Sequence, residues 1–199
     1  VYRAMVDDYQ RDDPVKPSLF LEGSYEYGTY RHECGWVTPV RVRRQFYQTY
    51  FAGGAGHTYG AGPVWAMRGS EGDYNCGYTW QQAIDFPGAA QVAGVGRKFL
   101  LDHTWHEWEP NGEVISETGQ GENLKTAVTT RSGDMAMVYF SNNSHTLVKN
   151  ILGKDAAVHW FYPRDGQIVQ DRPFAQNESR IMAPPAKWED AILVLRAGE

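Results

Sequence analysis

The sequence predicts an α/β segment followed by an all-β segment, and two observations carry this prediction. Between residues 1 and 102, short apolar runs alternate with helical patterns in the order helix, strand, helix, strand, helix. Such alternation implies right-handed βα units and a parallel sheet. Beyond about residue 110, short β-rich runs are separated by turn sequences, which is typical of an antiparallel β-sandwich.

The first helix and the first strand are predicted from apolar spacing. Residues 1–12 carry apolar side chains at helical spacing, and we expect them to be the end of a helix whose start is missing. Residues 16–23, KPSLFLEG, form a continuous apolar run between Pro17 and Gly23. Such a run is typical of a buried strand in a parallel sheet.

The next helix has clear start and stop signals. Thr38 is a good N-cap, Pro39 suits the first helical position, and Gly53 ends the apolar stripe. Residues 55–60, AGHTYG, predict a second short strand, and residues 87–102 predict a further helix. The loops after both strands are expected on one edge of the sheet, where α/β folds place their chemistry.

The second segment is predicted to hold about seven strands. The clearest strand patterns are residues 125–131, 134–140, 156–162, 166–170 and 190–197. The polar, Gly-rich stretch 109–123 is the expected boundary, with Val114 and Ile115 as candidates for docking on the first domain. The expected domains are therefore residues 1–110 and 111–199.

Composition favours a carbohydrate partner and argues against nucleic acid or a membrane span. The formal charge is -5 and there is no cluster of Lys or Arg, whereas 14% of the residues are aromatic. No stretch approaches the about 20 apolar residues of a transmembrane helix. His103 and His106 in HTWHEW have no third ligand nearby, so we expect packing between the domains there, with Trp105 and Trp108 in the contact. We expect no cofactor and no metal.

Several motifs resemble those of the apiosidase-like glycoside hydrolases, from about Lys16 to the end of the chain. The matching segments are EGSYE, RRQFYQTYFAGGAGHTYG, VWAM, DFPGAAQV and WFYPRDGQ. Leu21 and Gly23 depart from the family pattern G-E-P-x-Y-E, which usually has Gly and Pro there. The resemblance implies the C-terminal part of a (β/α)8 TIM barrel, with residues 19–23 and 55–60 in strands seven and eight. An antiparallel β-sandwich, often labelled collagen-binding, follows it.

The resemblance also implies an activity and partners. Because a complete barrel takes about 200 to 250 residues, we expect this chain to be a fragment, with the remainder of the barrel as its partner. The implied activity is that of a retaining glycoside hydrolase acting on plant or microbial polysaccharide, secreted, periplasmic or at the cell surface. The alternative is a non-catalytic protein that binds carbohydrate or a matrix protein.

Glu22 is the candidate nucleophile, because the resembled family carries its nucleophile at the end of strand seven and its acid/base on an earlier strand. The alternative is a strand-end carboxylate paired with Arg41 or Arg44. Glu26 does not complete the pair on an extended backbone, since four residues span roughly 13 Å and retaining enzymes need about 5 to 5.5 Å. Glu26 is expected either to contact substrate or to support the loop.

Other substrate contacts are expected near the two strand ends. His57 and Tyr59 alternate in GHTYG and are expected on one side of the strand. His57 is predicted to bind a sugar hydroxyl or orient Glu22, and the alternative is a buried histidine satisfied by backbone. The candidates for stacking on sugar faces are Tyr25, Tyr30, Trp36 and Trp65, with Trp65 favoured.

Cys34 and Cys76 fall in the loops after the two predicted strands, so we expect them to lie close together. A disulfide would suit a secreted enzyme, and two free thiols are the alternative.

Overall fold

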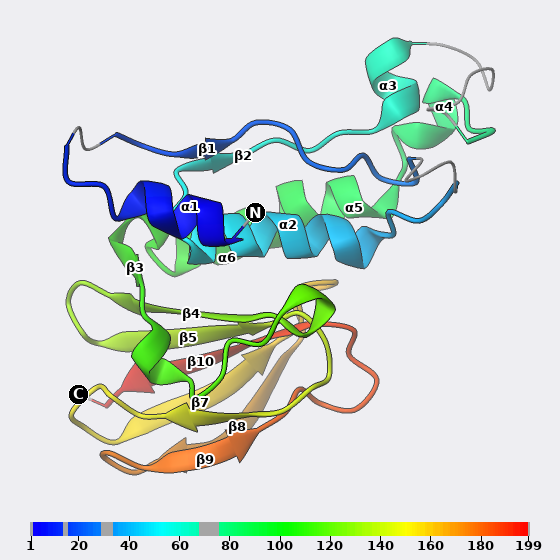
Figure 1. Cartoon of the computed structure of the whole chain (residues 1–199). Helices are drawn as coiled ribbons and strands as arrows, with labels where there is room; N and C mark the ends of the chain where they lie inside the picture. Colours follow the sequence, from blue (N-terminus) through cyan, green and yellow to red (C-terminus); the bar gives the residue numbers. More distant parts are fainter. Residues whose placement is uncertain (1, 14–15, 29–33, 68–75, 199) are drawn as a thin grey trace.

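The computed structural model describes residues 2–13, 16–28, 34–67 and 76–198. The molecule is layered (Figure 1). A two-stranded sheet lies on the outside, helices follow beneath it, and the helices rest on a six-stranded sheet. A second two-stranded sheet forms the far side.

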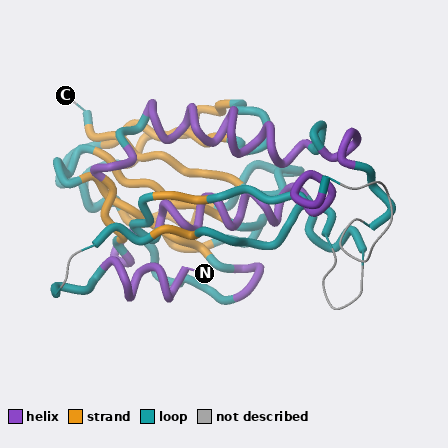
Figure 2. Tube along the Cα trace, turned by 90° about the horizontal axis from the view of Figure 1, so that it is seen from above, coloured by secondary structure: helices purple, strands orange, loops and turns teal. Residues whose placement is uncertain are grey.

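The outer sheet is built by a βαβ unit. Strands β1 (Leu19–Phe20) and β2 (Gly56–His57) pair in parallel, with Leu19 opposite Gly56, and helix α2 (Pro39–Phe51) connects them. Seen from above, α2 lies beneath the two strands, between α1 (Tyr2–Tyr9) and the helix that follows α4 (Figure 2). The helix predicted after Thr38 is confirmed, although the Thr38 side chain makes no capping hydrogen bond.

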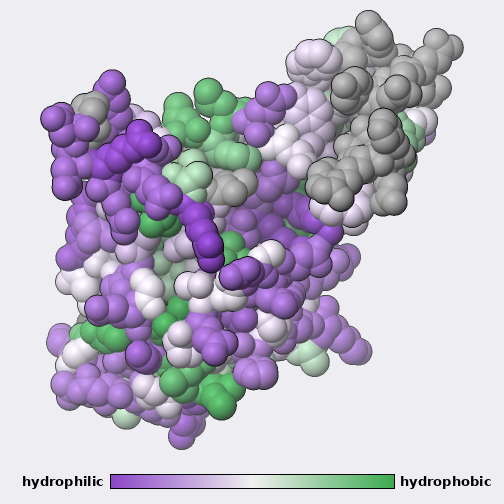
Figure 3. Space-filling view, in the orientation of Figure 1, coloured by the Kyte–Doolittle hydropathy of each residue, from purple (hydrophilic) through white to green (hydrophobic). Residues whose placement is uncertain are grey.

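The strand predicted to be buried is exposed on one face. Leu19 and Leu21 are 53% and 68% exposed, whereas Phe20 turns inward and stacks on His57 with ring centroids 5.6 Å apart. Within the described chain, β1 pairs with β2 alone and no element covers the outer face of the pair. A continuous apolar run is typical of a strand that is covered on both faces, but here only the face toward α2 is covered. Figure 3 shows the resulting hydrophobic patch over this sheet.

The helix predicted over residues 87–102 is confirmed, with an irregular centre. It consists of α5 (Pro87–Ala90), a π-helical segment η1 (Gln91–Gly96) and α6 (Arg97–Asp102). Before it, the long loop after β2 holds two short helices that the sequence did not predict, α3 (Gly62–Ala66) and α4 (Trp80–Ala83).

The second half is an antiparallel arrangement of eight strands. The six-stranded sheet has the order β3 (Trp108–Pro110), β4 (Lys125–Thr130), β5 (Met135–Phe140), β10 (Ala191–Ala197), β7 (Ala156–Phe161), β8 (Ile168–Phe174). The remaining pair is β6 (Thr146–Lys149) and β9 (Ser179–Met182). Three short 3-10 turns precede β4: η2 (Trp105–Glu107), η3 (Gly112–Val114) and η4 (Gly121–Asn123).

One hydrophobic core fills the space between the six-stranded sheet and the β6–β9 pair. Val138 and Leu193 of the large sheet pack there with Val148 of β6. Val114 and Ile115 also belong to this core, with exposures of 0% and 4%. Their suggested docking on the first domain is therefore wrong, because the η3 turn directs both side chains into the core of the second half.

A second core joins the helices to the other face of the six-stranded sheet. Tyr47 and Phe51 of α2 and Phe99 of α6 pack there with Tyr139 of β5. Trp108 is 3% exposed and meets Phe51 and Phe99 at centroid distances of 5.3 and 6.1 Å. The packing predicted for HTWHEW is thus confirmed at Trp108.

A buried ion pair also crosses this interface. Arg43 of α2 and Asp190, which precedes β10, have side chains that are 1% and 0% exposed, and their closest atoms are 2.8 Å apart. Arg43 also donates to Gln91 of the π-helical segment and to Glu189. Tyr139 donates to Asp190 Oδ2 at 3.0 Å, the oxygen that also accepts from Arg43 Nε at 3.1 Å. The two halves are therefore joined by a satisfied polar network inside an apolar layer.

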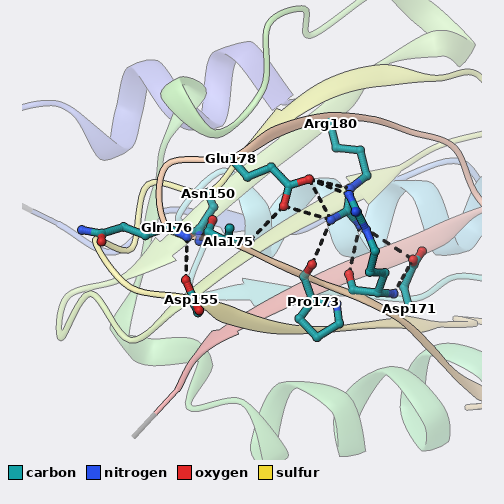
Figure 4. Close-up of polar contacts among 9 residues, drawn as sticks. Asn150, Asp155, Asp171, Pro173, Ala175, Gln176, Glu178 and Arg180 are labelled. Atoms are coloured by element: carbon teal, nitrogen blue, oxygen red, sulfur yellow. Dashed lines mark hydrogen bonds and ion pairs between the residues drawn. The ribbon is translucent and has the colours of Figure 1, made fainter.

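The turn between β8 and β9 holds a second polar network (Figure 4). Arg180 donates to both Glu178 oxygens and to the backbone carbonyls of Arg172 and Pro173, while Glu178 accepts from the Ala175 backbone N–H at 2.9 Å. These bonds satisfy the turn between two strands that belong to different sheets. The network is structural, since its polar groups bond to one another and to the backbone of this turn.

Candidate functional site

Glu22 lies just beyond β1, on the exposed rim of the outer sheet. Its Oε1 accepts a hydrogen bond of 2.9 Å from the Tyr25 hydroxyl. This bond to a carboxylate, together with some desolvation and the nearby negative charge, raises the pKa of Tyr25 above its ordinary value.

The proposed pairing of Glu22 with an arginine of the next helix is not what the structure shows. Arg41 forms its ion pair with Glu122, on the η4 turn, and Arg44 donates to the backbone carbonyl of Ser141 at 2.8 Å. Arg44 also lies 3.7 Å from Glu122. Both cations are therefore directed to the second half of the molecule and not to Glu22.

A cleft of about 450 Å³ lies beside Glu22. Tyr25, Thr58 and Tyr59 contribute to its lining, with the Tyr25 hydroxyl bonded to Glu22, and Trp65 of α3 brings an indole ring that is 76% exposed. An exposed aromatic ring next to hydroxyl groups and a carboxylate is suited to a sugar, because its face covers C–H groups while hydroxyls bond at the edges. The structure thus brings Glu22, Tyr25, Tyr59 and Trp65 together.

Trp36 belongs to the same loop after β1 as Glu22 and Tyr25, but it lies on a different surface. It lines a second hollow that also borders Glu22, and the guanidinium carbon of Arg41 lies 3.4 Å from the centroid of its ring. One ring face is therefore occupied by a cation. Trp36 is outside the lining of the Trp65 cleft.

Glu26 is fully buried, in contrast to Glu22. Its Oε1 accepts from the Gly88 backbone N–H at 2.8 Å, and its Oε2 accepts from the Tyr59 hydroxyl at 2.7 Å. Burial raises the pKa of Glu26, while the hydrogen bonds from Tyr59, Gly88 and Ala89 oppose this shift. Of its two expected roles, this geometry is that of loop support, because no part of the side chain reaches the cleft surface.

His57 is not brought to the cleft. Its ring stacks on Phe20 and meets Phe46 of α2 edge-on, each with centroids 5.6 Å apart. Among the described residues, its buried Nδ1 has no hydrogen-bond partner, so the backbone does not satisfy it. Burial lowers its pKa to about 4. The position is that of a core histidine, between the outer sheet and α2.

The loops that border the cleft are tied together covalently. Cys34 and Cys76 form a disulfide, with Cα atoms 5.3 Å apart, which decides between the two expectations for these thiols. Tyr30 lies outside the described residues. Two glycines that shape the site were not singled out from the sequence: a Cβ on Gly60 would overlap the Tyr25 ring, and one on Gly88 would overlap the Glu26 carboxylate. A glycine inside the first turn of a helix, as at position 88, is the signal that marks such a close approach.

The described part of the chain has no group of three or more His, Cys, Asp or Glu side chains arranged to hold a metal ion. Within the same residues, every helix is too short or too polar to cross a bilayer.

Comparison with known proteins assigns each half of the chain to a family model, in agreement with the resemblance seen in the sequence. Residues 1–107 match the family model described as "Apiosidase-like, catalytic domain", and residues 110–196 match "Putative collagen-binding domain of a collagenase". A search of curated proteins found no match.

Solved structures share the fold. A structure named "Glycoside hydrolase" has a TM-score of 0.84 at 24% identity, covering 94% of this chain and 43% of that one. A glycoside hydrolase family 5 protein from Bacteroides vulgatus ATCC 8482 has a TM-score of 0.84 at 22% identity, covering 96% and 44%. A GH30 endoxylanase from Clostridium papyrosolvens C71 has a TM-score of 0.53 at 13% identity, covering 97% and 46%.

The chain therefore spans less than half the length of these solved structures. Its first family match, by contrast, covers more than half of its own 199 residues. On that match, the chain belongs to the family of apiosidase-like catalytic domains.

Proposed function

We propose that this chain is part of a retaining glycoside hydrolase that cleaves plant or microbial polysaccharides, with Glu22 as its nucleophile. The observation that carries the proposal is an exposed carboxylate at the end of a parallel strand, held by a tyrosine hydroxyl and bordering a cleft with an exposed Trp65. The family match and the glycoside hydrolase folds support the reaction class.

In the proposed reaction, Glu22 attacks the anomeric carbon and forms a glycosyl ester while a second carboxylic acid protonates the departing oxygen. Water then hydrolyses the ester, and the second carboxyl group accepts its proton. Glu26 is unsuited to this second role because its oxygens are buried and bonded to Tyr59 and Gly88. We therefore assign the acid/base to a part of the enzyme outside this chain.

The same reasoning assigns β1 and β2 to strands seven and eight of a (β/α)8 barrel. The parallel pairing, the connecting helix α2 and the exposed Leu19 and Leu21 support this assignment, since the barrel interior would cover that outer face. The remainder of the barrel is then the structural partner of residues 1–110. Residues 111–199 would form the β-sandwich, with its core between the two antiparallel sheets.

The disulfide supports secretion to the periplasm, the cell surface or beyond, because disulfides persist in oxidising compartments. The alternative function, a non-catalytic protein that binds carbohydrate or a matrix protein, would use the same cleft without a reactive carboxylate.

The decisive experiment is Glu22→Gln in the longer polypeptide that carries the whole barrel. Glutamine keeps the shape but forms no glycosyl ester, so turnover on a panel of plant and microbial polysaccharides should fall by several orders of magnitude, on the order of the 10⁴-fold or more seen when a nucleophile is lost. The matched control is Glu113→Gln, an exposed residue of the second half. Ordinary turnover by the Glu22 variant would remove it from the mechanism, and an inverted anomer in the product, read by proton NMR, would exclude a retaining reaction. Polysaccharide binding without any turnover in the wild type would establish the non-catalytic alternative.

A further inference from the structure

The buried Glu26 is connected to Glu22 through a short set of backbone and side-chain contacts. The backbone N–H of Glu26 donates to the carbonyl of Gly60 at 2.9 Å, which joins the loop after β1 to the segment after β2. The side chain then accepts from Tyr59 and from Gly88 at the start of α5. Glu26 therefore fixes its own loop to two other segments at once.

The ring of Tyr25 is held by the same junction. The ring lies so close to Gly60 that a Cβ added to this glycine would overlap it. The backbone carbonyl of Tyr25 accepts from the Gly28 backbone N–H at 2.9 Å. The hydroxyl of this ring is the group that donates to Glu22. The location of the Tyr25 hydroxyl thus depends on how residues 25–28 are anchored beneath it.

The backbone of this turn is in a conformation that needs such anchoring. Tyr27 has a φ of 51°, in the left-handed region that residues with a Cβ rarely adopt. Its N–H donates to the Val37 carbonyl at 2.8 Å, and its ring packs on Phe86 and Tyr78 at 4.8 and 5.6 Å between centroids. A strained residue persists only where its surroundings determine it. The buried carboxylate next to it is one of those determinants.

We propose that Glu26 is a positioning residue for Glu22: by bonding Tyr59 and the start of α5, it holds Tyr25 where its hydroxyl orients the Glu22 carboxylate. The inference rests on the proposed function for Glu22, but the contact it concerns exists without substrate. It also gives a reason for two carboxylates four residues apart, one exposed for chemistry and one buried as an anchor.

The test follows the Tyr25 phenol in the longer polypeptide that carries the whole barrel, with ¹³C-labelled tyrosine and NMR titration, and Tyr25→Phe assigns the signal. Because the bond to Glu22 is the largest cause of the raised pKa of Tyr25, Glu22→Gln should return that pKa toward its ordinary value. Glu26→Ala should lower the pKa of Tyr25 by the same amount. The double variant should lower it no further, since both substitutions remove the same contact, the hydrogen bond between Tyr25 and Glu22. Glu26→Gln keeps an acceptor for Gly88 and should give a smaller fall, which provides a variant that folds if the alanine does not.

Phe174→Leu controls for general loss of stability, because Phe174 is fully buried in the core of the second half, away from this loop. It should lower the melting temperature and leave the Tyr25 titration unchanged. If both Glu26 variants lower the melting temperature but leave the Tyr25 titration as in the wild type, Glu26 is only structural and the proposal is wrong. This outcome is distinct from failure of the proposed function, which is read from the turnover of Glu22→Gln and not from the tyrosine.

Discussion

Replacing Arg43 with methionine should destabilise the chain more than most substitutions, because it leaves the Asp190 carboxylate buried without its cation. Arg43 supplies three contacts to that carboxylate, at 2.8, 3.1 and 3.2 Å, and among the described residues the hydrogen bond from Tyr139 is the side-chain contact that would remain. Both side chains are at most 1% exposed, so solvent does not screen the loss. Breaking a buried pair on one side costs about 3 to 5 kcal/mol. For a chain of this size, that corresponds to a fall of roughly 6 to 20 °C in the melting temperature.

The pH dependence of this loss gives a second readout. Burial raises the pKa of Asp190 and Arg43 lowers it, so removing Arg43 should raise it further. A carboxyl group whose pKa is higher in the folded state than in the unfolded state destabilises the fold at high pH. This penalty shrinks as the pH falls below the folded-state pKa and is gone below the unfolded-state pKa. The deficit of Arg43→Met should therefore shrink on acidification.

The assay is urea unfolding followed by tryptophan fluorescence at several pH values. The matched control is the double variant Arg43→Met with Asp190→Leu, which removes both charges and should recover most of the stability, because apolar replacements of a buried pair are often neutral. The reasoning is refuted if Arg43→Met costs less than about 1 kcal/mol, the range of exposed ion pairs, or if the double variant is no more stable than the single one.

Three further predictions are read from thermal unfolding by circular dichroism. Because burial lowers the pKa of His57 to about 4, its neutral form stabilises the fold above about pH 6.5, and this contribution is lost as the pH falls toward 4. His57→Phe should therefore flatten the dependence of the melting temperature on pH in this range, and an unchanged slope would contradict the prediction. Gly88→Ala should destabilise the fold by about 1 to 3 kcal/mol, since the added Cβ meets the buried Glu26 carboxylate. The control is Gly94→Ala in the same helix, whose Cβ meets nothing within 4 Å and which should stabilise the fold by up to about 1 kcal/mol. Equal effects of the two variants would rule out the steric explanation. Replacing Cys34 and Cys76 by serine opens a loop of 42 residues and should cost about 3 to 4 kcal/mol by chain entropy, so an unchanged melting temperature would show that the loops are held by other contacts.

Elements with strong local signals were predictable from the sequence. The helix after Thr38 and Pro39 was expected from its cap, its apolar stripe and the glycines that end it, and it is found at Pro39–Phe51. The strands at Met135–Phe140 and Ala191–Ala197 were expected from their β-rich runs. Residues at fixed spacing along one element determine such features, so no tertiary information is needed.

Weakly patterned elements were missed or misjudged. Strands β6 and β9 have four residues each and gave no clear pattern, because their form comes from pairing with each other across a long separation in sequence. The apolar run at Leu19–Leu21 predicted burial, but burial depends on what lies against each face, and one face of β1 is open in this chain.

For the site, the sequence by itself determined that the candidate residues follow two neighbouring strands, so that they lie at one edge of the sheet. Three of these candidates, Glu22, Tyr25 and Trp65, line one cleft for that reason. Only the tertiary structure decided how the remaining groups are used. It buried Glu26 on the start of a helix 62 residues further on, placed His57 in an apolar layer and joined Arg43 to a residue 147 positions away. These outcomes depend on contacts between distant segments, and the burial and hydrogen bonds that set the state of a carboxylate or an imidazole exist only once those segments meet.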